Sequence, residues 1–499
     1  MDYNSTRNDS VKVSASEAII KGLAPDGGLF VPVDFPRVDR FDLLKLSQMS
    51  YNERAYFILS RYLTDFTETE LKKCIDSAYS KEKFETDSIA PLYKLSNNMY
   101  ILELWHGPTC AFKDMALQIL PHFTVTASAK LGLDNETVIL VATSGDTGKA
   151  ALEGFRDVDN TKIIVFYPQS GVSHIQQLQM VTQEGSNVFV CAVNGNFDDA
   201  QNGVKAIFTD KAFAALLKQN KKAFSSANSI NWGRLAPQIV YYFSAYADLI
   251  KNEEIQTGDE INIVVPTGNF GNILAAYYAK RMGLPVSKLI CASNENNVLT
   301  DFINTGVYDK NREFKMTISP SMDILISSNL ERFLYDISGG DTEKINKLMS
   351  ELKSNGKYDV GEDMRKKISD IFCAGFCNDD ETLECIKNTQ ENYSYTLDTH
   401  TAVAVKVYTD YIKETGDNKK TVIASTASPY KFGKSVVGAV SGSDAVKGKN
   451  EFEIIEMLHD ISGLKVPPSL AALKDKKVRF ERVCKPDGMQ IAVKDFLNI

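Results

Sequence analysis

Lys113 is the residue of this chain with the clearest potential for catalysis. It lies in the run Gly-Pro-Thr-Cys-Ala-Phe-Lys-Asp (107–114), a turn that leads into an apolar helical pattern. Residues 99–104 have strand composition, so Lys113 is expected where a strand gives way to a helix, and such ends line clefts in α/β sheets. Trp105 and Phe112 would partly desolvate its ammonium, which lowers the pKa and frees the amine for a Schiff base. The alternative is a solvated surface lysine, because buried lysines are rare.

Two loops after predicted strands could bind anions. Residues 143–148, Thr-Ser-Gly-Asp-Thr-Gly, offer hydroxyls and free helix amides to a carboxylate or phosphate, although a tight capped turn is the alternative. This loop is not a nucleotide-binding loop, because Thr143 and Ala150 stand where that motif needs Gly and Ser or Thr. Residues 266–272, Pro-Thr-Gly-Asn-Phe-Gly-Asn, have two glycines three residues apart, which suits a backbone nest for a single phosphate.

Two further loops supply polar side chains. Residues 228–234, Asn-Ser-Ile-Asn-Trp-Gly-Arg, precede a predicted helix, and Arg234 could clamp a phosphate or carboxylate. An exposed or interface arginine is the alternative. Residues 425–432, Ser-Thr-Ala-Ser-Pro-Tyr-Lys-Phe, follow the last predicted strand, where a hydroxyl could hydrogen-bond a neutral heterocyclic nitrogen. A plain Ser/Pro turn would have the same composition.

The elements that must position these loops alternate along the chain. Strands without strict polar alternation, separated by helices, indicate parallel sheets covered on both faces, with sites at the carboxyl ends of the strands. The predicted strands are 137–142, 162–167, 187–193, 260–265, 288–292 and 421–425. The predicted helices between them are 148–156, 173–184, 198–218, 235–251 and 272–282.

The two ends of this α/β region have a different character. The first ninety residues are predicted to be mainly helical, with capping boxes at Ser14–Glu17 and Thr67–Glu70 and a long helical periodicity over 41–63. Residues 340–395 are rich in Lys and Glu and predict an amphipathic helical insertion. The expected division is an N-terminal helical segment 1–97, a first α/β domain 98–235 and a second α/β domain 236–499.

Composition narrows the classes of function and location. The 499 residues include 56 basic and 64 acidic ones, a net charge of −8, which disfavours nucleic acid as the main partner. No signal-type start and no membrane-length apolar run are present, so a cytoplasmic location without membrane contact is expected. The eight cysteines lack paired spacing, and no metal site is expected.

Together these motifs resemble the threonine synthase family, in its longer form with an N-terminal helical segment, among the pyridoxal-phosphate enzymes of the second fold type. The resemblance covers nearly the whole chain. Lys149, Ser428 and the pair Trp232-Gly233 depart from the usual residues of the family. The matching segments are 22–32, 106–114, 144–148, 228–231, 268–271, 398–402 (Asp-Thr-His-Thr-Ala) and 426–429.

The resemblance implies two parallel-sheet α/β domains with a cofactor cleft between them and assigns roles to individual residues. Lys113 would form the Schiff base with pyridoxal 5'-phosphate, and Thr426 would contact the ring nitrogen. The cofactor phosphate would lie in a cup made by Gly268, Asn269, Phe270, Gly271 and Asn272. The amino-acid end of the substrate would face Ser144, Gly145, Asp146 and Thr147, and its phosphate would face Asn231 and Arg234.

The activity that the resemblance implies is conversion of O-phospho-L-homoserine and water to L-threonine and phosphate, by γ-elimination and β-addition of water, in a monomer or dimer. One scaffold hosts many reactions, so a phospho-lyase or a β-replacing enzyme on a related amino acid stays open. A noncatalytic binder of a phosphorylated metabolite is a further alternative. An ATP-dependent kinase is disfavoured by the failed nucleotide motif.

Overall fold

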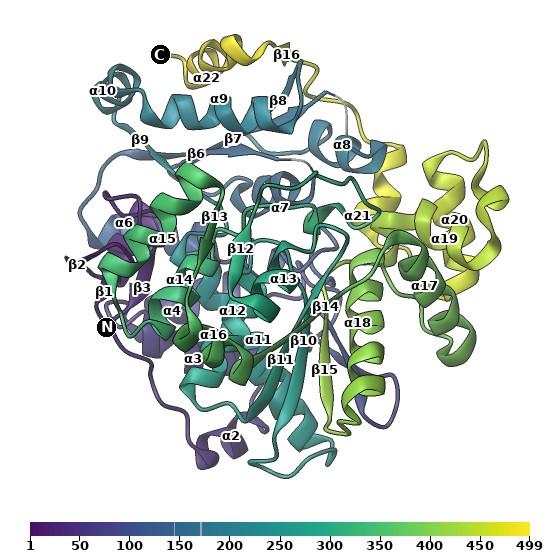
Figure 1. Ribbon diagram of the computed structural model, residues 1–499. Helices are drawn as coiled ribbons and strands as arrows, with labels where there is room; N and C mark the ends of the chain where they lie inside the picture. Colours follow the sequence, from purple (N-terminus) through teal and green to yellow (C-terminus); the bar gives the residue numbers. More distant parts are fainter. Residues whose placement is uncertain (144, 170–171) are drawn as a thin grey trace.

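The computed structural model describes residues 1–143, 145–169 and 172–499. Two mainly parallel sheets, each lying between helices, form the frame of the molecule (Figure 1). The predicted α/β fold with two parallel sheets and an N-terminal, mainly helical segment is confirmed. No helix within the described ranges has both the length and the apolar character that crossing a membrane requires.

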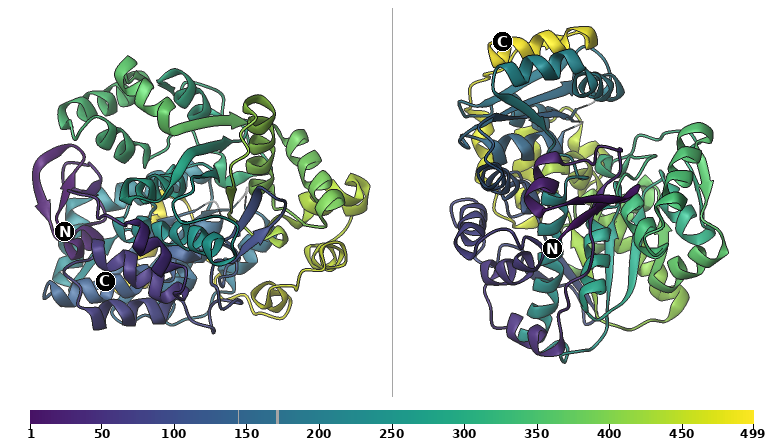
Figure 2. Two further views of the ribbon diagram at one scale, coloured as in Figure 1. Left: turned by 90° about the horizontal axis from the view of Figure 1, so that it is seen from below. Right: turned by 90° about the vertical axis from the view of Figure 1, so that its left-hand side faces the viewer.

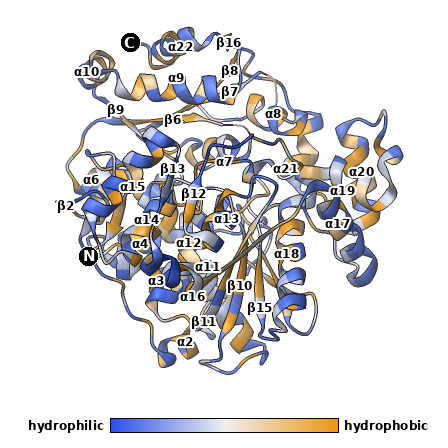
Figure 3. Ribbon diagram, in the orientation of Figure 1, coloured by the Kyte–Doolittle hydropathy of each residue, from blue (hydrophilic) through white to orange (hydrophobic). Residues whose placement is uncertain are grey.

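The larger sheet has six strands in the order β14-β11-β10-β15-β5-β4. All neighbours are parallel except β4, which runs antiparallel to β5 at one edge. β10 and β15 are buried along their whole length, which explains their largely apolar sequences (Figure 3). The strands are β4 (Leu92–Lys94), β5 (Met99–Glu103), β10 (Ile261–Pro266), β11 (Val286–Ser293), β14 (Phe372–Phe376) and β15 (Thr421–Ser425).

The smaller sheet has five parallel strands in the order β16-β8-β7-β6-β9. Its edge strand β16 comes from the C-terminal segment, and the C-terminal helix α22 (Met489–Leu497) packs beside α9 (Phe197–Thr209) on the outer face (Figures 1 and 2). The C-terminal residues therefore complete a sheet whose first strand, β6, begins 347 residues earlier in the chain, and tertiary packing brings the two together. The strands are β6 (Glu136–Ala142), β7 (Thr161–Pro168), β8 (Val188–Val193), β9 (Lys222–Ser225) and β16 (Val483–Cys484).

Helices cover both sheets, and α11 (Trp232–Lys251) is buried over most of its length against α3, α5 and α12. The single helix expected over 198–218 is two helices, because Asp210 ends α9 and caps α10. The other helices of this region are α5 (Asp114–Leu117), α6 (Leu120–Lys130), α7 (Asp146–Phe155), α8 (His174–Val181), α10 (Lys211–Gln219), α12 (Gly271–Met282), α13 (Val298–Thr305), α14 (Leu330–Ile337), α18 (Thr399–Thr415), α19 (Gly433–Ser441), α20 (Glu451–Ser462) and α21 (Pro468–Ala471).

The N-terminal segment contains four helices and a small antiparallel sheet that the sequence did not predict. Both predicted capping boxes, at Ser14 and Thr67, are confirmed. The continuous helix expected over 41–63 is wrong, because Ser50 forms a further capping box with Glu53 and starts a second helix. The elements are β1 (Tyr3–Ser5), β2 (Asn8–Val13), α1 (Ala15–Lys21), β3 (Phe30–Pro32), α2 (Arg40–Leu46), α3 (Tyr51–Tyr62) and α4 (Glu68–Ala78).

The segment 340–395 is only partly the helical insertion that its charges indicate. Three helices are present, α15 (Thr342–Asn355), α16 (Glu362–Ile371) and α17 (Asp379–Tyr393). Between them, β13 (Lys357–Asp359) pairs with β12 (Val307–Asp309), and β14 joins the larger sheet beside β11. The charged helices therefore surround a strand that belongs to the main sheet.

The division at residues 97 and 235 remains a prediction. Each sheet takes strands from both sides of a proposed boundary, since β5 pairs with β15 in the larger sheet and β16 pairs with β8 in the smaller one. The molecule is therefore organised around two sheets, each of which contains strands from more than one of the predicted domains.

Candidate active site

Lys113 lies in the turn between β5 and α5, at the carboxyl end of a strand of the larger sheet. The turn is fastened to the end of β15, because the Phe112 amide donates to the Thr426 carbonyl over 2.8 Å. The Lys113 side chain is buried, with 8 % of its surface exposed, and its amine is 3.3 Å from the Ser321 hydroxyl. Burial lowers the pKa of Lys113, and the positive charges of Lys431 and Arg234 act in the same direction.

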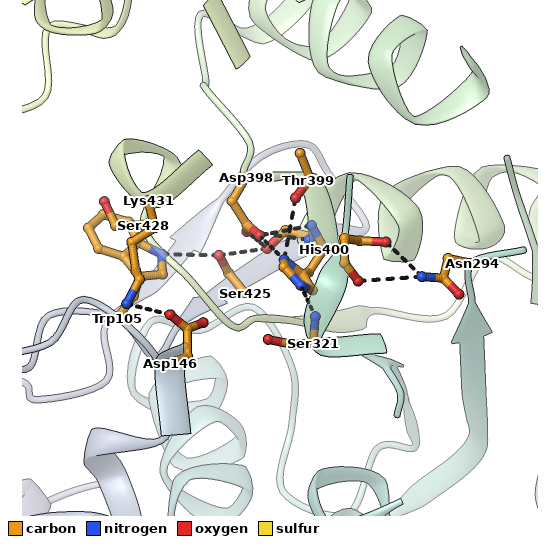
Figure 4. Close-up of polar contacts among 12 residues, drawn as sticks. Trp105, Asp146, Asn294, Ser321, Asp398, Thr399, His400, Ser425, Ser428 and Lys431 are labelled. Atoms are coloured by element: carbon orange, nitrogen blue, oxygen red, sulfur yellow. Dashed lines mark hydrogen bonds and ion pairs between the residues drawn. The ribbon is translucent and has the colours of Figure 1, made fainter. Parts of the chain in front are cut away.

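Asp146 lies between two lysines at the start of α7. Its Oδ1 is 2.6 Å from the Lys431 amine (Figure 4) and accepts a hydrogen bond of 2.9 Å from Gln176. Its Oδ2 is 3.5 Å from the Lys113 amine. Burial alone would raise the pKa of Asp146, but the charges of Lys431 and Lys113 outweigh it and hold the pKa well below its usual range. The carboxylate is therefore ionised and joins groups that follow strands of both sheets.

The loop after β10 has the geometry of an anion cup. Phe270 adopts a left-handed conformation with φ of 64°, and α12 begins at Gly271, so free helix amides face the loop. A Cβ at Gly268 would lie 2.7 Å from the Ser321 carbonyl, so this position leaves no room for a side chain. The Asn272 amide nitrogen is buried without a hydrogen-bond partner among the described residues. These features fit the phosphate of pyridoxal phosphate.

Polar contacts from neighbouring elements hold the rest of the cup in place. The Asn272 side-chain oxygen accepts hydrogen bonds of 2.6 Å from Tyr241 and 2.5 Å from Tyr242. The Asn269 carbonyl accepts from the Asn329 amide over 3.2 Å. The Asn272 amide is therefore oriented by two tyrosines of α11.

Thr426 directly follows β15 and is buried. Its neighbour Ser425 accepts a hydrogen bond of 3.0 Å from the Trp105 indole (Figure 4), and a second one of 3.0 Å from Thr401. Within the described residues the Thr426 hydroxyl makes no hydrogen bond. Its position beside the Lys113 turn is compatible with the expected contact to a ring nitrogen, and that role remains a prediction.

Arg234 is buried in the first turn of α11. One of its terminal nitrogens donates to the Ala227 carbonyl over 2.8 Å, its Nε has no partner among the described residues, and no carboxylate pairs with it there. Burial lowers the pKa of Arg234 to about 10, so the guanidinium stays charged at neutral pH. A buried cation with unused donors is suited to bind an anion.

Asn231 has its amide engaged within the chain. Its oxygen caps α11 by accepting from the Gly233 amide over 2.9 Å, and its nitrogen donates to the carbonyls of Ile19 and Ser226 over 3.0 and 2.9 Å. The side chain therefore ties α11 to α1. Its expected contact with the substrate phosphate remains a prediction, and a structural role accounts for its contacts.

The predicted substrate loop is only partly described. Ser144 lies outside the described residues. Gly145 has φ of 149°, and a Cβ there would lie 2.5 Å from Gln176, while Thr147 is half-buried in the first turn of α7. Lys149 does not belong to this loop's anion-binding face, because its amine is 3.0 Å from Glu153.

Sequence reasoning did not assign Lys431, His400 or Ser321. The His400 Nε2 accepts from the Ser321 amide over 3.1 Å, and its Nδ1 lies 3.1 Å from Asp398 (Figure 4). The Ser321 hydroxyl in turn accepts from the Lys113 amine over 3.3 Å. His400 lies in the segment 398–402 that the family resemblance includes, and Lys431 lies two residues beyond the segment 426–429, but neither has a spacing that marks it. Only the packing of distant segments reveals them.

Comparisons with known proteins agree with this geometry. Residues 2–79 match the family model "Threonine synthase N terminus", residues 87–362 match "Pyridoxal-phosphate dependent enzyme", and residues 401–496 match "Threonine synthase, C-terminal". A structure of pyridoxal-phosphate-bound threonine synthase from Brucella melitensis is 36 % identical, with a TM-score of 0.88 and full coverage of both chains.

Two curated relatives differ in length. The chain is 39 % identical to threonine synthase of Saccharomyces cerevisiae over 468 residues, covering 88 % of this chain and 89 % of the relative. It is 41 % identical to human threonine synthase-like 1 over 485 residues, covering 95 % of this chain, but it spans only 64 % of the length of that relative. Pyridoxal 5'-phosphate is the cofactor of the matching family. The chain belongs to the threonine synthase family of pyridoxal-phosphate-dependent enzymes.

Proposed function

We propose that this chain converts O-phospho-L-homoserine and water to L-threonine and inorganic phosphate. One observation carries the proposal: Lys113 presents a buried amine and Arg234 a buried, incompletely hydrogen-bonded guanidinium, whose charge adds to the lowering of the Lys113 pKa by burial. Such a pair matches a substrate that has both an amino group and a phosphate ester. The family membership supports the same reaction.

The cofactor would be held by groups from three loops. Lys113 would bind it covalently, residues 268–272 would bind its phosphate, and Thr426 would contact the ring nitrogen. When bound, pyridoxal phosphate supplies an electron sink for bonds broken on the amino-acid carbon atoms. A hydroxyl at Thr426, unlike a carboxylate, would favour the uncharged form of the ring nitrogen.

The residues of the chain then move protons and stabilise charge. The lowered pKa of Lys113 favours the free amine, the form that can take a proton from the substrate and later return it. Arg234 would stabilise the charge of the phosphate as it leaves. Residues 144–147, which include Asp146, would hold the amino-acid end of the substrate.

Product analysis tests the reaction directly. The full-length chain, loaded with pyridoxal phosphate, is incubated with O-phospho-L-homoserine, and the products are separated and quantified. L-Threonine and phosphate in equal amounts are expected. Release of 2-oxobutanoate with phosphate would instead make the protein a phospho-lyase, and binding without phosphate release would make it a noncatalytic binder.

Lys113→Ala should abolish turnover and covalent attachment of the cofactor, because it removes the only amine that the proposal uses. After borohydride reduction, mass spectrometry should find the cofactor on Lys113 in the wild type and none in the variant. Lys434→Ala, which removes an exposed lysine of α19, is the control and should behave as the wild type. Wild-type turnover by the Lys113 variant would contradict the proposal.

A further inference from the structure

Lys431 is a buried lysine that the proposed reaction does not use. It lies in the short 3-10 helix 429–432 that follows β15, and its side chain is fully shielded from solvent. Its amine donates to the Thr109 carbonyl over 3.0 Å and is 2.6 Å from Asp146 Oδ1. Thr109 belongs to the turn that carries Lys113, so Lys431 touches both the carboxylate and the lysine-bearing loop.

The two lysines compete for one carboxylate. Asp146 Oδ1 makes the short contact with Lys431, whereas Oδ2 is 3.5 Å from the Lys113 amine. A buried carboxylate that is already neutralised can stabilise a second ammonium only weakly, since each buried charge needs a partner of its own. Lys113 is therefore the lysine left without a dedicated counter-ion.

The other groups around Lys113 do not supply one. Arg234 from α11 adds positive charge, and Ser321 offers only a hydroxyl at 3.3 Å. The Phe112 ring, 5.0 Å from the amine, is a weak attraction for the ammonium and opposes its loss of a proton. Asp146 is thus the one anion that reaches Lys113 among the described residues, and its charge opposes the lowering of the Lys113 pKa by burial.

We propose that Lys431 is a positioning residue that neutralises Asp146 across the two sheets and thereby keeps the Lys113 amine in its uncharged form. The arrangement also explains how a buried aspartate can lie beside the amine while the pKa of Lys113 stays below its ordinary value. This inference rests on the proposed role of Lys113, but it concerns the protonation of the amine and not the identity of the substrate.

The protonation of Lys113 can be measured without turnover. The full-length chain is freed of cofactor by dialysis against hydroxylamine, and trace acetic anhydride labels its amines over a range of pH. Peptide mass spectrometry gives the labelling of Lys113 relative to the exposed Lys434, and the midpoint of this ratio reports the ionisation of Lys113. Circular dichroism confirms that each variant is folded.

The proposal predicts that two variants shift the Lys113 labelling midpoint in opposite directions. Lys431→Met should raise the Lys113 midpoint by about one pH unit or more, because Asp146 is then free to pair with Lys113. Asp146→Asn should lower the midpoint, because the remaining charges around the amine are positive. Lys431→Arg keeps the charge and should give a midpoint nearer to that of the wild type than Lys431→Met does.

A purely structural role of Lys431 would not move the midpoint in this way. An unchanged midpoint in folded Lys431→Met would overturn the inference. If that variant does not fold, an Asp146→Asn midpoint at or above the wild-type value would overturn it as well. The proposed reaction fails separately, by the absence of threonine among the products, while the shifts described here would still be observed.

Discussion

At the residue scale, the same burial has different consequences for the two cations of the site. Arg234 has a pKa lowered to about 10 and remains charged at neutral pH, which suits a permanent phosphate ligand. Lys113 starts from a lower ordinary value, and burial lowers its pKa further, which suits a group that gains and loses protons. Arg234 is therefore suited to anion binding and Lys113 to proton transfer, because the two side chains differ in their ordinary pKa.

Arg234→Gln is expected to weaken binding of phosphate-bearing ligands. A hydrogen bond to a charged group contributes about 1.5–3 kcal/mol, so the inhibition constant of inorganic phosphate and the KM for O-phospho-L-homoserine should rise about 10-fold or more. The cofactor spectrum should change little, because Arg234 is not part of the cup at 268–272. Steady-state kinetics with phosphate as a competitive inhibitor measures both constants.

The control for this variant is Arg365→Gln, which removes a half-exposed arginine on α16. Its kinetic constants should match those of the wild type. An unchanged inhibition constant of phosphate in Arg234→Gln would rule out Arg234 as the phosphate ligand.

At the element scale, α7 shows how a helix stabilises the loop before it. Lys149 and Glu153 are one turn apart, their charged atoms are 3.0 Å from one another, and the Gln183 side chain contacts both. Burial alone would raise the pKa of Glu153, but Lys149 and Arg156 reverse this and lower it to about 2. Lys149, a departure from the usual family residue, is therefore explained by a partner within its own helix.

Glu153→Gln is expected to lower stability in a pH-dependent way. A pKa of about 2, against an ordinary value of 4.5, corresponds to about 3 kcal/mol of stabilisation by the ionised form. Because the folded-state pKa is the lower one, this stabilisation is complete above pH 4.5 and is lost as the pH falls towards 2. Urea unfolding of both proteins at pH 7, 5 and 4 should show a difference that shrinks only at the lowest pH.

Glu456→Gln, at an exposed position of α20, serves as the matched control and should leave the unfolding free energy unchanged. A Glu153→Gln difference that stays constant down to pH 4 would show that the ion pair contributes nothing through its charge.

At the scale of the whole molecule, the N-terminal segment is joined to the site through hydrogen bonds. The fully buried Arg332 of α14 donates to the Phe30 carbonyl over 2.9 Å, to Asn329 over 2.6 Å and to the Ile230 carbonyl over 2.5 Å. Asn329 in turn contacts the cup at Asn269. One guanidinium therefore joins the N-terminal segment, the loop before α11 and the phosphate cup.

Arg332→Met is expected to destabilise the protein by at least about 3 kcal/mol, because two buried acceptors and one partly buried acceptor lose their donor at about 1–3 kcal/mol each. Urea unfolding measures the loss, and limited proteolysis should show faster cleavage within residues 1–79. Arg37→Met, an exposed position in the same segment, is the control. Equal stability of the Arg332 variant and the wild type would show that the N-terminal segment is not coupled to the site through this residue.

The sequence by itself determined the local elements and most of the loops that carry chemistry. Strand composition at 261–265 and 421–425, and the capping boxes at Ser14 and Thr67, depend on neighbouring residues, so they could be recognised along the chain. The glycines of 266–272 and the apolar residues next to Lys113 could be recognised for the same reason, because they are close together in the sequence. Errors arose where one polar residue interrupts a helix, as Ser50 and Asp210 do.

Only the tertiary structure decided which segments meet. The pairing of β5 with β15, the entry of β14 into the larger sheet and of β16 into the smaller one, and the contact of Lys431 with Asp146 join residues far apart in the chain. Long-range packing and burial create these contacts, and they leave no periodicity or spacing in the sequence. The motif around Lys113 is local, so the sequence indicated this amine. The charged groups around it come from distant segments, so only the folded molecule shows them.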